Sequence, residues 1–440
     1  LLTGWIRTEN VEGGAALWLR QDAGGESVAF RNTQQDPVTG TTDWQRVVIR
    51  LPLEETADTV VFGGLLAGTG TAWFDDFTLT VDGRSLDEAP VSEPSVLQTD
   101  TEFASGSGIA TTEPTDEQIR RLVLLGEVWG FLKYHHPAVT SGRRHWDFEL
   151  FRVLPDVLAA RDEAWLRDTM IAWLDRVGRP APCDPCADLA TDDLHLAPPI
   201  EWIHDTDRLG TALSSRLVGI HARRSADPSQ FYVRLNPHAG NPDFRHELAY
   251  GDVPFPDPGF QLLALFRAWN VARWWFPYRD LIDEDARALL AEFVPRIMGA
   301  GDPDAYALEL MAFIARFDDG HAGLWSATHL RPPRGHCRLP VAVEFVEDRP
   351  VVSDVLDPES TDLIAGDVLV ALDGERVDDL VAEWAPYHSG SNETARRKSL
   401  AFSMTRGDCG PCELTIERDG QVEDVAALRV PVEDLDTARS

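Results

Sequence analysis

The chain has 440 residues, of which 40 are basic and 73 are acidic, so its net charge is -33. At roughly 100–200 residues per domain, this length predicts more than one domain. A polyanion of this size repels the phosphates of nucleic acids and the surfaces of anionic lipids, so we expect neither class of partner. No stretch reaches the roughly 18 consecutive apolar residues of a membrane helix, and we expect no membrane span. Apolar residues make up 43% of the chain, which is enough to build hydrophobic cores.

Residues 1–83 show the alternation of apolar and polar residues that is typical of β-strands. The clearest runs are 16–20, 44–49 and 73–79, with clusters of Gly, Asp and Pro between them. Short strands with regular turns predict a β-sandwich, although another antiparallel sheet would give the same pattern. Residues 84–113 are rich in Ser, Thr, Pro, Glu and Gly, and we expect them to form a linker.

Residues 114–337 are expected to form a helical domain with an internal repeat. Thr115 and Gln118 match a capping box and begin a run of apolar residues with helical spacing. Ten residues recur 140 positions later without a gap, and Trp129 and Trp269 are one of these pairs. Because Trp is rarely matched by chance, we infer two copies of a helical unit, at about 122–177 and 262–317. Coincidence between two amphipathic bundles is the alternative.

Residues 338–430 return to a β pattern. The runs that predict strands are 342–346, 349–353, 367–372 and 413–417. Asp373-Gly374 and Asp419-Gly420 predict hairpin turns, and a polar helix is expected over 377–384. Residues 431–440 are expected to be a tail or the beginning of a further domain.

The five cysteines are Cys183, Cys186, Cys337, Cys409 and Cys412. Their odd number leaves at least one thiol without a partner in the same chain. Cys183, Cys186, Cys409 and Cys412 form two distant pairs, for which we expect disulfides. Zinc binding completed by His336-Cys337 is an alternative, and free thiols are another. A strand is predicted directly after Cys412, which does not fit a thioredoxin redox motif. We expect no metal ion and no other cofactor.

Four short motifs occur in an order that resembles one protein family. They are Lys133-Tyr134-His135-His136-Pro137, Ala268-Trp269-Asn270, Asp318-Asp319-Gly320-His321-Ala322 and Ile364-Ala365-Gly366-Asp367-Val368-Leu369. The set resembles the serine peptidase family of tricorn and C-terminal-processing (tail-specific) proteases, over about residues 115–430. Residues 1–83 resemble a jelly-roll domain of the carbohydrate-binding-module type, through Trp44-Gln45-Arg46 and Trp73-Phe74-Asp75-Asp76.

This resemblance implies a multidomain α+β fold. A jelly-roll β-sandwich would be followed by the duplicated helical domain and then by a PDZ-like β domain. The α/β catalytic core of the family, with its serine nucleophile, would lie beyond residue 440.

The resemblance also implies roles for two groups of residues. His321 would be the general base that accepts the proton of the serine, with Asp318, Asp319 and Gly320 as its neighbours. The alternative is a histidine that caps the end of a helix beside acidic residues. A PDZ-like domain would take a peptide C-terminus as an added strand. The peptide-binding candidates are Ile364, Gly366, Asp367, Val368 and Leu369.

Two functions from different classes follow. In the first, the chain is the N-terminal part of a secreted or periplasmic serine peptidase, inert alone because its nucleophile is missing. In the second, it is a non-catalytic protein that binds a glycan or surface through residues 1–83 and peptide C-termini through residues 338–430. Both place the protein in the periplasm or outside the cell, with a peptide or protein as its partner. The sequence predicts nothing about the oligomeric state.

Overall fold

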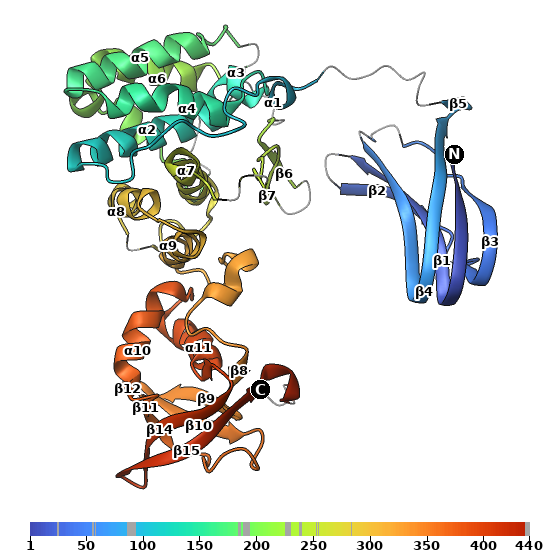
Figure 1. Cartoon of the computed structure of the whole chain (residues 1–440). Coiled ribbons are helices and arrows are strands. Elements are labelled where there is room, and N and C mark those ends of the chain that lie inside the picture. Colours follow the sequence, from blue (N-terminus) through green and yellow to red (C-terminus); the bar gives the residue numbers. More distant parts are fainter. Residues whose placement is uncertain are drawn as a thin grey trace. The chain divides into compact units, whose positions relative to one another are not determined.

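The chain is a mixed α+β protein that divides into two compact units, Leu1–Pro94 and Ser95–Ser440 (Figure 1). The computed structural model describes residues 1–23, 26–54, 57, 59–85, 94–183, 186–187, 194–224, 230–236, 240–251, 253, 255–282 and 284–435. Within these residues there are several β-sheets and two groups of helices. The multidomain α+β class expected from the sequence is therefore present.

The first unit contains one five-stranded sheet where two packed sheets were expected. Its strands are β1 (Leu2–Ala23), β2 (Glu26–Asn32), β3 (Val38–Ile49), β4 (Thr59–Val81) and β5 (Arg84–Ser85). The order is β2-β1-β4-β5, and β3 pairs with the first part of β1. The predicted runs 16–20 and 73–79 are parts of two long strands, β1 and β4, which pair along most of their length, and the run 44–49 lies in β3. This long-range pairing is why the jelly-roll sandwich prediction was wrong.

Two glycines allow β1 and β4 to approach closely where their register shifts. Gly13 and Gly68 face each other with φ of +113° and +94°, a region that favours glycine. A Cβ at either position would overlap the backbone carbonyl oxygen of the opposite strand. The core of this sheet consists of apolar side chains from β1 and β3, among them Leu2, Ile6, Leu17 and Ile49.

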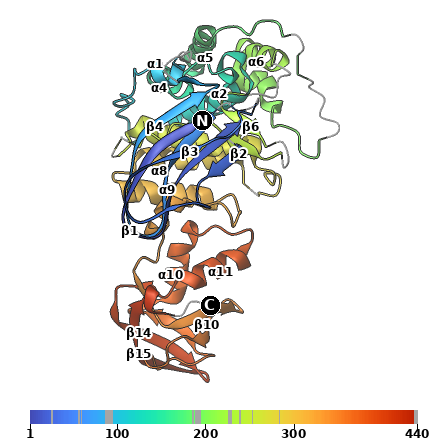
Figure 2. The ribbon, with the colours of Figure 1, turned by 90° about the vertical axis from the view of Figure 1, so that its right-hand side faces the viewer.

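The second unit begins with two sets of three helices that follow the 140-residue repeat. The first set is α2 (Asp116–His135), α4 (Trp146–Leu158) and α5 (Glu163–Val177). The second set is α7 (Pro258–Trp275), α8 (Ala286–Met298) and α9 (Pro303–Ala315). In Figures 1 and 2, the second set lies between the first set and the C-terminal sheet. In the sequence, the two sets are separated by α6 (Thr206–Ala222) and the short strands β6 (Val233–Leu235) and β7 (Pro242–Phe244).

Equivalent residues of the two sets make equivalent contacts. The indole N–H of Trp129 donates to the carbonyl of Trp146 at 3.2 Å, and that of Trp269 donates to the carbonyl of Ala286 at 2.7 Å. Each tryptophan therefore ties the first helix of its set to the beginning of the second. Both indole rings are buried, which adds a large apolar area to the core.

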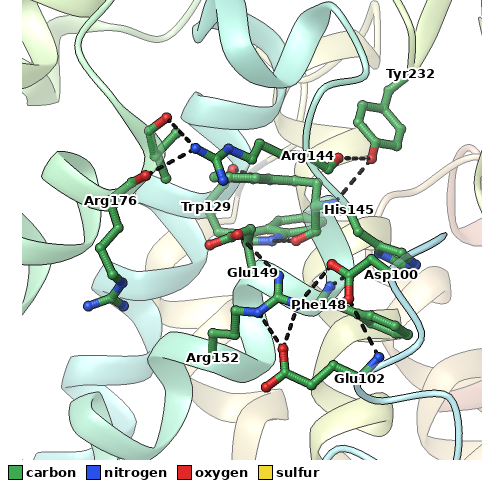
Figure 3. Close-up of polar contacts among 12 residues, drawn as sticks. Asp100, Glu102, Trp129, Arg144, His145, Phe148, Glu149, Arg152, Arg176 and Tyr232 are labelled. Atoms are coloured by element: carbon green, nitrogen blue, oxygen red, sulfur yellow. Dashed lines mark hydrogen bonds and ion pairs between the residues drawn. The ribbon is translucent and has the colours of Figure 1, made fainter. Parts of the chain in front are cut away.

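Part of the expected linker over 84–113 packs on the first helical set. Residues 86–93 lie outside the described residues, whereas 94–113 include α1 (Val96–Thr99) and contact α4. Arg152 of α4 pairs with Asp100 at 2.8 Å and with Glu102 at 2.6 Å (Figure 3). Phe103 contacts two aromatic rings of the same helix. These few anchors hold a segment whose composition predicted a free linker.

The two helical sets meet where α2 crosses α7. Gly126 and Gly130 of α2 face α7, and the Asn270 amide fills the space in front of Gly130. That amide donates to the carbonyls of Gly126 at 3.1 Å and Phe266 at 2.9 Å. Asn270 is fully buried, and these bonds satisfy its donor group. The two helices can therefore approach closely because glycine, which has no side chain, occupies both positions.

An ion cluster beside this crossing joins four helices. The fully buried carboxylate of Glu127 on α2 forms ion pairs with three arginines. They are Arg208 of α6, Arg273 of α7 and Arg287 of α8. Arg273 lies 3.1 Å and Arg287 2.8 Å from the carboxylate. A buried charge is tolerated only when it is paired, so these partners must come together with α2.

The C-terminal part of the second unit is a sheet with two helices. Its strands are β8 (Cys337–Arg338), β9 (Val341–Val346), β10 (Arg349–Val355), β11 (Val368–Leu372), β12 (Glu375–Arg376), β13 (Arg406–Gly407), β14 (Gly410–Arg418) and β15 (Gln421–Pro431). The order is β13-β8-β15-β14-β11-β10-β9, with β12 against β11. The helices are α10 (Val377–Trp384) and α11 (Glu393–Ser403).

Both predicted Asp-Gly turns are left-handed, as such hairpins require. Asp373 and Gly374 have φ of 51° and 85°, and Asp419 and Gly420 have φ of 51° and 77°. The first turn joins β11 to β12, and the second joins β14 to β15. Of the predicted tail, residues 436–440 lie outside the described residues.

None of the helices in the described part of the chain has the length and apolar character needed to cross a membrane.

Replacing Gly130 with alanine is expected to destabilise the second unit. The new methyl group would overlap the Asn270 amide, and overpacking of this kind costs about 1–3 kcal/mol. The matched control is Gly219→Ala in α6, where a Cβ meets nothing within 4 Å. The free energy of unfolding of the control should rise by roughly 0.4–1 kcal/mol, because alanine restricts the conformations of the unfolded chain. Urea unfolding of both variants measures this difference, and equal stability would contradict the proposed crossing.

His135 makes the stability of the fold depend on pH. Its buried ring lies 2.9 Å from the Phe131 carbonyl and stacks on the Phe131 ring. Burial, with help from the nearby charges of His221 and Arg224, lowers the pKa of His135 to about 3. Because the ordinary pKa is about 6.5, the unfolded chain binds the proton more readily below that pH. The contribution of neutral His135 is therefore complete above pH 6.5 and falls as the pH drops toward 3.

Substituting His135 by Phe is expected to weaken this pH dependence. Between pH 7.5 and pH 5, protonation of His135 in the unfolded chain should lower the free energy of unfolding of the wild-type chain by about 2 kcal/mol. The variant lacks this contribution. Position 275 of the second copy already holds a tryptophan, so an aromatic ring fits such a site. Urea unfolding at pH 7.5 and pH 5 gives the difference for each protein. Identical differences would show that His135 does not titrate with folding.

Candidate functional site

His321 lies on an exposed loop directly after α9. Its side chain is fully exposed, with Nδ1 at 3.4 Å from a carboxylate oxygen of Asp319. The backbone N–H of His321 donates to the same oxygen at 2.9 Å. Asp318 has a φ of 49° and pairs with Arg396 of α11 at 2.7 Å. The acidic neighbours therefore shape and anchor this turn.

The serines nearest to this loop do not engage the imidazole. The hydroxyl of Ser389 donates to the carbonyl of Ala322 at 2.7 Å, and Ser391 lies near Gly320. Among the described residues, no hydroxyl is hydrogen-bonded to the ring of His321. A general base needs its proton donor at roughly 2.6–3.2 Å. The general-base role of His321 therefore stays a prediction, because the described structure shows no hydroxyl hydrogen-bonded to its ring.

The predicted peptide-binding residues form a turn and a central strand. Gly366 has a φ of 101°, and the carboxylate of Asp367 accepts the N–H of Ile364 at 2.8 Å. Burial opposes ionisation of Asp367, but the bonds from Arg418 and from the Ile364 N–H hold its pKa below the usual value. Val368 and Leu369 belong to β11, between β10 and β14. Of the set, only Ile364 presents a large exposed side chain, and the set does not converge on one pocket.

A groove lies at the edge of the sheet, between β9 and α11. In the described residues β9 is the last strand of the order, and α11 packs beside it. The pocket between them has a volume of about 420 Å³. Val343, Phe345 and Ala401 supply apolar surface, and Thr394 and Lys398 supply polar groups. This arrangement leaves a strand edge open beside a helix.

Two cations of α11 line this groove, and they differ in their partners. Arg397 pairs with Asp348 and with Glu393, so its charge is already compensated. No described residue forms a hydrogen bond or ion pair with the ammonium group of Lys398, which leaves it available to an anionic ligand.

Sequence reasoning missed α11 and therefore missed the groove. The segment 393–403 is polar and shows little apolar periodicity. One signal could have found it, because Asn392 is a strong N-cap residue and its side chain accepts the N–H of Ala395 at 2.8 Å. The apolar contacts of the helix come from Leu400 and Ala401, near its end.

One of the two expected cysteine pairs is confirmed, and the other is wrong. Cys183 is bonded to Cys186, and Cys337 is bonded to Cys409. Cys412, expected to pair with Cys409, is a buried free thiol. Burial raises the pKa of Cys412 to about 12, which disfavours the reactive thiolate. The correction has a topological cause, because β8 and β13 are neighbouring strands and bring Cys337 close to Cys409.

The part of the chain that the structure describes contains no group of three or more His, Cys, Asp or Glu residues arranged to hold a metal ion.

Comparison with known proteins gives one partial similarity and no family. No family model matches the chain. Over 97 residues, the chain is 32% identical to a Bacillus subtilis (strain 168) protein named "Uncharacterized HTH-type transcriptional regulator YbfP". The similar region is 22% of this chain and 33% of that protein, so the match spans about a third of the relative.

These comparisons overturn the resemblance to tricorn and C-terminal-processing peptidases, including its PDZ-like and jelly-roll domains. The structure explains why short motifs misled. Asp318 and Gly366 hold turns with positive φ, and Trp269 ties two helices together. Such residues are required by local structure, and unrelated proteins with the same turns and helix contacts share them.

Proposed function

We propose that this chain is a non-catalytic binding protein that takes up the C-terminus of a peptide in the groove between β9 and α11. The observation that carries the proposal is the open strand edge of β9 beside a pocket of about 420 Å³. Backbone N–H and C=O groups at a sheet edge are templates for an added strand. An extended peptide would satisfy these groups and gain main-chain hydrogen bonds.

The side chains of the groove suit the end of a peptide. Alternate residues of an added strand would point toward the apolar surface of Val343, Phe345 and Ala401. The ammonium group of Lys398 would pair with the terminal carboxylate. The neighbouring acids Glu344 and Glu347 would disfavour a second negative charge on the peptide.

Between the two functions expected from the sequence, we favour binding over peptide hydrolysis. His321 is exposed, and in the described structure its ring has no hydroxyl partner. Binding at β9 requires only groups that are already in place.

Glycan binding by residues 1–83 stays a prediction. The exposed rings of Trp44 and Trp73 are the surfaces on which a sugar could stack. The guanidinium of Arg7 lies 4.9 Å from the centre of the Trp73 ring and covers one face of it. This contact competes with a sugar for that face.

A periplasmic or extracellular location belongs to the proposal. Two disulfides, Cys183–Cys186 and Cys337–Cys409, support it, because such bonds persist mainly in oxidising compartments. The name of the Bacillus protein refers to transcriptional regulation, but we propose no DNA-binding role for this chain. Its net charge of -33 would repel the phosphates of DNA.

The test uses fluorescein-labelled hexapeptides that end in Val, Leu, Phe or Ala, each with a free carboxylate or an amide. Thr394→Trp should fill the groove and weaken binding by at least about tenfold, because Thr394 is exposed and lines it. Thr394→Ser, the matched control, should bind like the wild-type chain. Lys398→Gln should remove the preference for the free carboxylate. Fluorescence anisotropy measures each affinity.

Two outcomes would contradict this proposal. The first is that none of these peptides binds the wild-type chain. The second is that Thr394→Trp binds the peptides as tightly as Thr394→Ser does.

A further inference from the structure

Two adjoining cavities lie along the face of α11 that neighbours the face bordering β9. The larger, of about 490 Å³, extends between α9, the 322–331 segment and α11. The smaller, of about 410 Å³, continues toward β13. They share five lining residues, Trp325, Thr328, Arg331, Ser399 and Phe402. Both volumes are in the range of small-molecule sites.

The charges that line these cavities are of one sign. Arg331 lines both cavities, Lys398 lines the larger, and Arg406 lines the smaller. None of the described residues that line either cavity is Asp or Glu. Such a concentration of positive charge is unexpected in a chain with 73 acidic and 40 basic residues.

The arginines of this cluster lack counter-ions. No described residue forms a hydrogen bond or ion pair with the guanidinium of Arg331, and the Nε of Arg406 is buried without a partner. Arg338, behind them, is buried, and its Nε is also unpartnered. Burial and the charge of Arg406 lower the pKa of both Arg331 and Arg338. An unpaired buried charge is costly, so a bound anion would stabilise this arrangement.

Apolar rings stand beside the cations. Trp325 is 73% exposed and Phe402 is 57% exposed, although both line the cavities. The guanidinium of Arg338 lies 5.7 Å from the centre of the Phe402 ring, so a flat ligand would stack on the other face of that ring and on Trp325.

We propose that these cavities bind a small organic anion that carries an aromatic ring. Arg331 and Arg406 pair with the anionic group, and Trp325 and Phe402 hold the ring. Enclosure in a cavity and guanidinium forks favour a carboxylate or phosphate on a compact ligand. The inference does not rest on peptide binding at β9, since the groups assigned to this ligand, Arg331, Arg406, Trp325 and Phe402, do not line that groove.

Isothermal titration calorimetry of the whole chain with phenyl phosphate tests the proposal. Inorganic phosphate and benzyl alcohol, each missing one half of the ligand, should bind at least about tenfold more weakly than phenyl phosphate. Arg331→Gln and Arg406→Gln should each lose at least about tenfold in affinity for phenyl phosphate. Trp325→Ala should weaken the binding of phenyl phosphate but leave the affinity for inorganic phosphate unchanged.

The matched control is Arg334→Gln, which removes the same charge three residues from Arg331. Arg334 is exposed and paired with Asp304, so its loss should change affinity by less than about twofold. The arginine variants should fold with unchanged or higher thermal stability, because each relieves like-charge repulsion. If either fails to fold, Trp325→Ala still decides the outcome. Absence of phenyl phosphate binding, or an equal loss in Arg334→Gln, would overturn the proposal.

Discussion

The close crossing of α2 and α7 is the contact on which the second unit depends. Gly126 and Gly130 bring the two helices together, and the buried Asn270 amide closes the gap with two hydrogen bonds. The same crossing places Glu127 within reach of three arginines from three other helices. The two copies of the repeat are therefore joined by shape and by charge. Neither copy could bury these groups alone.

This helical body positions both proposed binding sites. The end of α9 leads into the loop of Asp318, whose carboxylate pairs with Arg396 of α11. The helix α11 is thereby fixed between two surfaces. One face borders β9 and the peptide groove, and the adjacent face borders the cationic cavities. Lys398 lines both sites, so occupation of one site would change the electrostatic field in the other.

The parts of the fold that local patterns determine could be predicted from the sequence. Helices recurring at an interval of 140 residues, the Asp-Gly turns and α10 all lie where the residues indicated. The single sheet of residues 1–83 and the Cys337–Cys409 disulfide depend on pairing between distant strands, which no local pattern encodes. The helix α11 was missed because it is polar, and both proposed sites were missed with it. The family motifs were turn and contact residues, which carry little information about function.

Strand addition at β9 is tested most directly by hydrogen–deuterium exchange of the whole chain, with and without a saturating apolar-ended hexapeptide. The backbone amides over 341–346 that point away from β10 should exchange at least about tenfold more slowly in the complex, because the added strand would accept hydrogen bonds from them. Amides of β14, which pairs with β11 on one side and β15 on the other, should be unchanged. Unaltered exchange over 341–346 with bound peptide, or protection confined to the other edge at β13, would contradict the proposed binding mode.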